Sequence, residues 1–176
     1  MKLKRFCLRC RLACAFAVLG SSALLAGVFA STAAASEFTT QVTPNNTFAL
    51  LLDVSGASTA PGAPVIDWWA NGGANQNWTF NSVGPASTYE IINQNSGQCL
   101  TTDGVPGDQV TQMPCVGSLQ QEWLTAFNPG RGPRMIQSVY SGLYLDVNSD
   151  SPWPGASIDT WYYNGNSNQY FSSLFG

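Results

Sequence analysis

Short apolar runs separated by turn dipeptides fill the chain after about residue 40. Residues 49–52, 89–92 and 135–140 have the apolar, β-branched and aromatic content of β-strands. Ser-Gly, Pro-Gly and Asn-Gly dipeptides lie between such runs and mark turns. No window keeps a helical apolar period over three turns. The pattern therefore predicts an all-β fold of many short strands, either a barrel or a sandwich.

Two parts of the chain repeat each other at a constant distance of 93 residues. The paired elements are Leu-Asp-Val at 52 and 145, Pro-Gly-Ala at 61 and 154, Trp at 68 and 161, Asn-Gly at 71 and 164, and Asn-Gln at 75 and 168. A shorter copy lies between them, from Cys99-Leu100 to Gln121-Glu122-Trp123. Three units of about 45 residues (roughly 41–85, 86–131 and 132–176) favour a barrel with pseudo-threefold symmetry. They are called repeats one, two and three below.

The N-terminal residues have the composition of a secretory signal peptide. Five of the seven basic residues lie in the first eleven positions, ahead of an apolar run at 12–30 and an Ala-rich stretch at 33–35. We therefore expect a signal peptide at 1–35, an N-terminal extension at 36–46 and one domain at 47–176, in a secreted, extracellular protein. An uncleaved N-terminal anchor is the alternative. No later run approaches the roughly 20 apolar residues that span a bilayer.

Removing the leader changes the charge of the chain. Only Arg131 and Arg134 then stand against ten acidic residues, a formal charge of −8. Nucleic acid and anionic membrane surfaces need a basic face, so both are excluded as partners of the mature chain. All six Trp and all six Tyr remain in it beside many Asn, Gln, Ser and Gly residues. Such a surface suits neutral polar ligands.

Cysteine and histidine usage limits the chemistry further. Only Cys99 and Cys115 follow the leader, and an even pair in an exported protein predicts one disulfide. The chain has no His, which excludes a Ser-His-Asp hydrolase and a His-based metal site. Asp103 and Asp108 are candidates for a glycosidase pair, but they lie in turn-like segments of the least site-like repeat. We expect no enzymatic activity, no catalytic residue, no cofactor and no metal site.

A calcium-binding loop is a further alternative, because the segment from Asp146 to Asp150 starts like an EF-hand. The sixth position of that loop is Ser151 where Gly is required, and the twelfth is Ser157 where Glu is required. The EF-hand interpretation therefore fails, and calcium binding of a looser kind stays as the alternative.

Together these motifs resemble the ricin B-type lectin domain, also described as carbohydrate-binding module family 13. The likeness covers residues 47–172 and rests on the Leu-Asp-Val elements, the Trp residues after the turns, the three Gln-x-aromatic ends and the cysteine pair. The resemblance implies an all-β β-trefoil of three repeats. It also implies a carbohydrate as partner, with galactose, N-acetylgalactosamine or xylan-type glycans as first candidates.

The residue types at these positions suit sugar binding. An ionised Asp accepts hydrogen bonds from two hydroxyls, an Asn both donates and accepts, and a Trp offers a flat surface to the C–H face of a sugar. The resemblance implies that Gln orients the site from behind. The predicted carbohydrate-binding residues are Asp53, Trp68, Asn75 and Gln76 in repeat one, and Asp146, Asp159, Trp161, Asn168 and Gln169 in repeat three.

The repeats differ in ways that rank the sites. Repeat two has Thr101 at the Asp position and Met113 at the aromatic position, so we expect it to bind no sugar. Repeat one has Ile66 two residues before its Trp, where repeat three has Asp159, which makes repeat three the better candidate. Trp153, also in repeat three, is a possible extra stacking surface.

The aromatic residues that end the three repeats are expected in the core of the barrel, at Trp78, Trp123 and Phe171.

The sequence thus predicts a secreted, non-enzymatic lectin with one or two shallow sugar sites in repeats one and three. The alternative is a trefoil scaffold with decayed sugar sites that binds a protein partner, for example as a protease inhibitor.

Overall fold

The computed structural model describes residues 37–47, 49–85, 87–127 and 132–174. The predicted signal peptide lies outside the described residues. The strands are β1 (Glu37–Pro44), β2 (Leu50–Val54), β3 (Val65–Trp69), β4 (Asn77–Gly84), β5 (Thr88–Asn93), β6 (Cys99–Thr101), β7 (Thr111–Met113), β8 (Glu122–Leu124), β9 (Gln137–Ser138), β10 (Tyr144–Val147), β11 (Ile158–Trp161) and β12 (Phe171–Leu174). The 3₁₀ helices are η1 (Ser55–Ala57), η2 (Ala74–Gln76), η3 (Leu119–Gln121), η4 (Asn148–Asp150) and η5 (Ser167–Gln169).

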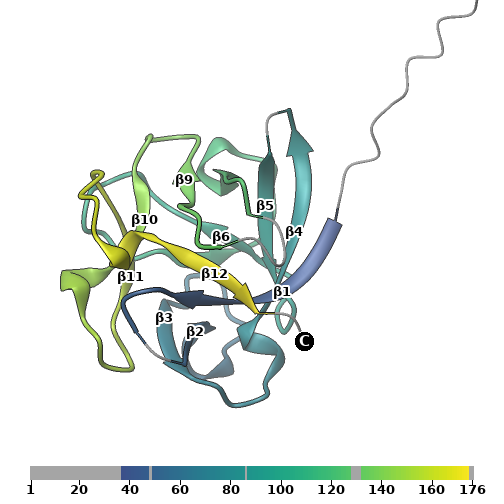
Figure 1. The fold of residues 1–176 in the computed structure, drawn as a ribbon. Coiled ribbons are helices and arrows are strands. Elements are labelled where there is room, and N and C mark those ends of the chain that lie inside the picture. The colour runs from purple at the N-terminus through teal and green to yellow at the C-terminus, as the bar shows by residue number, and fades with distance from the viewer. Residues whose placement is uncertain (1–36, 48, 86, 128–131, 175–176) are drawn as a thin grey trace, which may run out of the picture. The chain divides into compact units, whose positions relative to one another are not determined.

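Six strands form a closed barrel, two from each repeat. Antiparallel pairs run in the order β12-β1-β4-β5-β8-β9. A bridge between Arg134 and Phe171 then joins the segment before β9 back to β12 and closes the ring. Figure 1 shows β1 and β12, the first and last strands, side by side.

The other six strands form three hairpins, β2–β3, β6–β7 and β10–β11. Backbone hydrogen bonds join one hairpin to another: Val65 N–H donates to Val110 O at 3.0 Å, and Val110 N–H donates to Ile158 O at 2.8 Å. These three residues occupy the same position in the three repeats and are fully buried. The hairpins therefore cap one end of the barrel with the same pseudo-threefold arrangement.

The turn of each hairpin is also bonded to the hairpin of another repeat. The N–H groups of Gly62, Gly107 and Gly155 donate at 2.8–2.9 Å to the carbonyls of Gln112, Thr160 and Asp67 respectively. Repeat one is thereby joined to repeat two, repeat two to repeat three, and repeat three to repeat one. The cap is a ring of three mutually dependent hairpins.

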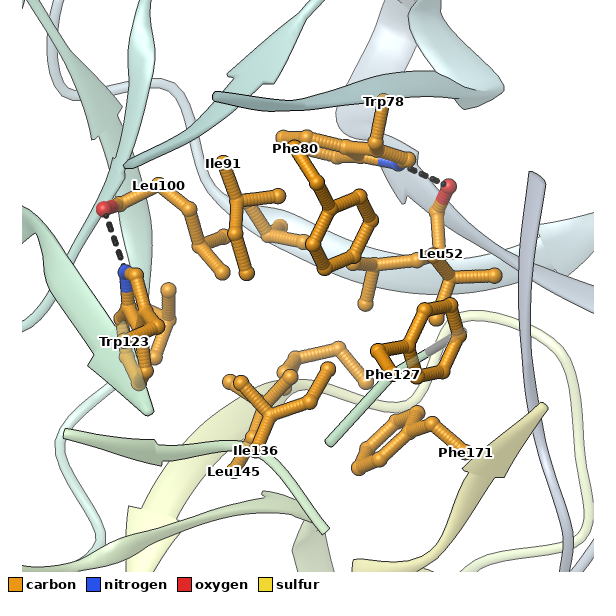
Figure 2. Close-up of a cluster of buried hydrophobic side chains, with 14 of the residues drawn as sticks. Leu52, Trp78, Phe80, Ile91, Leu100, Trp123, Phe127, Ile136, Leu145 and Phe171 are labelled. Atoms are coloured by element: carbon orange, nitrogen blue, oxygen red, sulfur yellow. Dashed lines mark hydrogen bonds between the residues drawn. The ribbon is translucent and has the colours of Figure 1, made fainter. Parts of the chain in front are cut away.

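The core repeats the same symmetry (Figure 2). The indole N–H groups of Trp78 and Trp123 donate to the carbonyls of Leu52 and Leu100, at 3.0 and 2.9 Å. Each fully buried large apolar side chain contributes roughly 1.5–3 kcal/mol to folding. The fully buried positions shared by the repeats are Leu52, Leu100 and Leu145; Val65, Val110 and Ile158; and Trp78, Trp123 and Phe171.

The prediction of a β-trefoil with three repeats is confirmed: twelve strands and no α-helix are present in the described residues, and the three repeats build a capped barrel. The aromatic ends of the repeats lie in the core as expected. The strand predicted over 135–140 shortens to the two residues of β9. The reason is a turn that follows directly, in which Gly142 N–H donates to Ser138 O at 2.9 Å.

The predicted disulfide is present between Cys99 and Cys115, whose Cα atoms lie 5.1 Å apart. Among the described residues no helix is long and apolar enough to cross a membrane.

Candidate functional site

The hairpin β2–β3 turns its functional side chains away from the core because side chains alternate along a strand. Leu52 and Val54 point inward and are fully buried. Asp53 lies between them on the opposite face, and its cross-strand neighbour is Ile66. Trp68, two residues after Ile66, shares this face and is 41% exposed. A carboxylate and an indole are thus brought together by the pleat alone.

Three amide side chains converge on one oxygen of Asp53. Its Oδ2 accepts hydrogen bonds from Gln76 Nε2 at 2.7 Å, Asn75 Nδ2 at 2.9 Å and Asn71 Nδ2 at 3.4 Å. The other oxygen, Oδ1, receives no hydrogen bond from the described residues. Burial raises the pKa of the Asp53 carboxyl, against the opposing effect of the three amides. The arrangement fixes the carboxylate and leaves one acceptor for a ligand.

Gln76 supports this site from behind, as the resemblance implied. Its amide is fully buried, donates to Trp69 O at 2.8 Å and accepts from Asn71 N–H at 2.9 Å. On its open side the site is a cavity. In repeat one the cavity is about 340 Å³, and it is lined by Asp53, Ser55, Gly56, Ala57, Ile66, Trp68, Asn71 and Asn75.

Repeat three places the corresponding residues on and after β10–β11, but the amides are distributed over both oxygens of the carboxylate. Asp146 Oδ1 accepts from Asn168 Nδ2 at 2.8 Å, and Oδ2 accepts from Asn164 Nδ2 at 3.2 Å. Gln169 is fully buried and donates to Tyr162 O at 2.8 Å. The cavity is about 320 Å³, and it is lined by Asp146, Asn148, Ser149, Asp150, Asp159, Trp161, Asn164, Asn166 and Asn168.

Two carboxylates face each other across the repeat-three hairpin. Asp146 and Asp159 are direct cross-strand partners, and both are buried. Asn148 Nδ2 donates to Asp159 Oδ2 at 2.7 Å, but Oδ1 of Asp159 is buried and has no partner among the described residues. Burial raises the pKa of Asp146 to about 6, and the charges of Asp159 and Asp150 add to the effect. Burial also raises the pKa of Asp159.

The loops after the two carboxylates have the same unusual backbone. Gly56 and Ala57 have φ angles of 63° and 51°, and Ser149 and Asp150 have 58° and 51°. Left-handed backbone at a non-glycine residue costs roughly 1–2 kcal/mol. Both loops line a cavity, and the fold holds Ser149 and Asp150 there despite that cost.

A glycine turn from the neighbouring repeat covers the ring of each Trp. A Cβ added to Gly155 would lie 3.3 Å from Trp68, and one added to Gly107 would lie 3.1 Å from Trp161. Both glycines have positive φ, 91° and 87°, so only glycine fits without strain or contact. Each of the two sites is therefore completed by a second repeat.

This arrangement changes the expected place of Trp153. The sequence puts Trp153 in repeat three, but its turn, which contains Gly155, packs against Trp68 of repeat one. Trp153 is 75% exposed. Trp153 lines neither cavity, and the contact between its turn and Trp68 is what links it to repeat one.

Repeat two has a pocket of different chemistry, with a volume of about 600 Å³. Thr101 replaces the carboxylate, and its hydroxyl donates to Cys99 O at 2.8 Å while accepting from Gln121 Nε2 at 3.1 Å. That hydroxyl is thus used internally. Met113 replaces the Trp and lies 38% exposed in the pocket wall. The repeat-two pocket therefore has no indole and no carboxylate at the position of Asp53 and Asp146, although Asp103 lies in its wall.

The glycosidase alternative has no suitable geometry. A hydrogen bond to the Asp103 carboxyl raises the pKa of Asp108. Carboxyls in hydrogen-bond contact are closer than the roughly 5–9.5 Å that glycoside hydrolysis requires. In the described residues no group of three or more His, Cys, Asp or Glu side chains is arranged to hold a metal ion.

The structure brings the predicted residues together in two groups, one on each cavity, with the two Gln residues behind them. Sequence reasoning missed Asn71 and Asn164, which donate to the two carboxylates. The Asn-Gly element that contains them recurs at the repeat distance of 93 residues, and this was the available signal. It also missed Asn148 and Asp150 of the loop after β10.

Two hairpins of a β-trefoil, each with a fixed buried carboxylate, amide donors and an exposed indole, have the arrangement of a lectin domain. Residues 74–161 match the model of the family described as ricin-type beta-trefoil lectin domain-like. The match covers half of the chain, and the protein belongs to this family. A comparison with curated protein sequences found no match.

Solved structures give the same fold. The designed threefold symmetric protein ThreeFoil is 28% identical, with a TM-score of 0.71 over 78% of this chain and 98% of its own. An exo-β-1,3-galactanase from Clostridium thermocellum is 26% identical, with a TM-score of 0.72, and the 78% of this chain that aligns spans 30% of it. The C-half of the earthworm R-type lectin, solved in complex with GalNAc, is 20% identical, with a TM-score of 0.59 over 77% of this chain and 98% of its own.

Proposed function

We propose that the protein is a secreted, non-enzymatic lectin that binds carbohydrate through the cavities of repeats one and three. One observation carries the proposal: both cavities combine a carboxylate held by amide side chains with an exposed indole. Repeat two, which lacks both groups, serves as scaffold. The sites are shallow, and tight binding comes from joining them, which can raise avidity by roughly 10²–10⁴.

Each cavity supplies what a sugar needs. The carboxylates of Asp53 and Asp146 accept hydrogen bonds from ring hydroxyls, and Asn75 and Asn168 orient them. The half-exposed indoles of Trp68 and Trp161 stack on the C–H face of the ring. Galactose, N-acetylgalactosamine and xylan-type glycans are the first candidates. The N-acetylgalactosamine bound to the earthworm lectin supports the second of these.

Export fits the rest of the chain. The basic, apolar and Ala-rich segments at 1–35 support a signal peptide, and the Cys99–Cys115 disulfide suits an oxidising compartment. An N-terminal extension at 36–46 and one lectin domain at 47–176 would remain after cleavage.

The test is a glycan-array screen of the purified protein with its disulfide intact, including plant and microbial polysaccharides. We expect binding to one sugar family that the free sugar competes away. The double variant Asp146→Ala/Trp161→Ala should lose the repeat-three share of that binding and keep the far-UV spectrum. Asp53→Ala/Trp68→Ala is the matched variant for repeat one. A flat array from folded protein would contradict the lectin proposal and favour the protein-binding scaffold.

A further inference from the structure

The two sugar cavities share a frame but differ in charge. Repeat one has Ile66 and Ala57 at the positions where repeat three has Asp159 and Asp150. The cavity of repeat one therefore contains a single carboxylate, that of Asp53, whereas the cavity of repeat three contains three. The difference lies at the cavity wall, where a ligand would make contact.

Among the described residues no cation balances the carboxylates of repeat three. Asp146 and Asp159 lie directly opposite each other on paired strands, an arrangement that is unfavourable for like charges. Arg134 is the one basic residue within the described ranges, and its guanidinium donates to the carbonyls of Gly132 and Pro133. The negative charge of this cavity is left for a ligand to neutralise.

A specific acceptor atom is also unused. Asp159 is 2% exposed and lines the cavity, yet its Oδ1 has no hydrogen-bond partner among the described residues. A buried carboxylate oxygen without a donor costs free energy that a donor from a ligand would recover. Ionised carboxylates only accept hydrogen bonds, so the ligand group must donate.

We infer that the repeat-three cavity binds a cationic amino sugar, a hexose with a free protonated amine, whereas the repeat-one cavity binds a neutral sugar. The ammonium group has three donors and no acceptor, so it complements the pair formed by Asp146 and Asp159. N-acetylation removes the charge and most of the donors. The inference rests on the proposed lectin function and names the ligand class of one of its two sites.

The experiment follows ligand binding at each site by the N–H signal of the indole in that site, Trp68 in repeat one and Trp161 in repeat three. Protein labelled with ¹⁵N at tryptophan is followed by NMR at pH 7.5 in the presence of a chelator. It is titrated with galactosamine, N-acetylgalactosamine and galactose, and separately with glucosamine, N-acetylglucosamine and glucose. The indole N–H signals are assigned with Trp68→Phe and Trp161→Phe. At Trp161 we expect the amine to bind about tenfold more tightly than the neutral sugars, as charge-assisted hydrogen bonds imply. At Trp68 the three ligands of a series should differ less than about threefold.

Asp159→Asn keeps the shape of the side chain and removes its charge. We expect it to reduce the amine preference at Trp161, the ratio of the affinities for the amine and for the neutral sugar, to about threefold or less. The control variant Asp103→Asn removes an exposed carboxylate from the repeat-two turn and should leave the amine preference at Trp161 unchanged. If Asp159→Asn does not fold, the comparison of the free and N-acetylated amine on the unmodified protein still decides.

Three results would overturn the inference. Neutral sugars that bind at Trp161 as tightly as the amine would refute the amino-sugar preference and leave the lectin proposal intact. Sugar binding at Trp161 that requires added calcium would assign the carboxylates to a metal ion. No response of either indole to any sugar would refute the lectin proposal and the inference together.

Discussion

Replacing Asp67 by Asn should stabilise the protein at neutral pH and not at acid pH. Asp67 lies in β3 and is fully buried. Its Oδ1 accepts from Ala156 N–H at 2.9 Å, across to repeat three, while Oδ2 is buried without a partner among the described residues. Burial raises the pKa of this carboxyl from 3.8 to about 6. The folded protein therefore holds the proton of Asp67 more tightly than the unfolded chain does.

The size and sign of the effect follow from proton linkage. The stabilising contribution of the protonated group is complete below pH 3.8 and is lost as the pH rises through about 6. A shift of this size corresponds to about 3 kcal/mol at neutral pH. Asn has no proton to lose, and its amide oxygen can keep the bond from Ala156. For a domain of this size, each kcal/mol changes Tm by roughly 2–4 °C.

Urea unfolding of the two proteins at pH 4, 5, 6 and 7.5 measures the difference. We expect the two proteins to unfold alike at pH 4, and Asp67→Asn to be about 2–3 kcal/mol more stable at pH 7.5. Burial also raises the pKa of Asp53, Asp146 and Asp159, so the unmodified protein should lose stability over the same pH range. The difference between the two proteins isolates Asp67. A stability difference that does not depend on pH would refute the reasoning.

Two further predictions concern the disulfide and Trp153. Replacing Cys99 and Cys115 by Ala should cost about 3 kcal/mol of unfolding free energy in urea, since the disulfide closes a loop with a sequence separation of 16; an unchanged midpoint would contradict this. Trp153→Ala should weaken oligosaccharide binding reported by Trp68 by roughly threefold to tenfold and leave binding reported by Trp161 unchanged. Weaker binding at Trp161 with unchanged binding at Trp68 would instead assign Trp153 to the repeat-three site.

The fold was predictable because its core positions recur along the chain. Leu52, Leu100 and Leu145 face the interior in the same place of each repeat, as do the aromatic residues that end the repeats. A recurring apolar position reports a recurring environment, so alignment of the repeats was enough to predict a threefold barrel. The grouping of Asp, Asn and Trp in repeats one and three was predictable for the same reason.

Contacts between repeats could not be predicted in this way. The turn at Gly155 packs against Trp68, which lies more than 80 residues away in the sequence. Nothing in the local pattern of either segment specifies that contact. Asp67 is a second case, because an acidic residue is expected at the surface unless it is paired. Its burial depends on the repeat-three turn that donates to it.

The pairing of β1 with β12 affects how the domain can be combined with other proteins. β1 and β12 are antiparallel and Gln41 is the cross-strand neighbour of Leu174, so β1 starts on the side of the barrel wall where β12 ends. A domain whose ends lie close together tolerates circular permutation and insertion into a loop of another protein. A host protein could therefore accept this lectin fold as an internal cassette and keep its own chain path nearly unbroken.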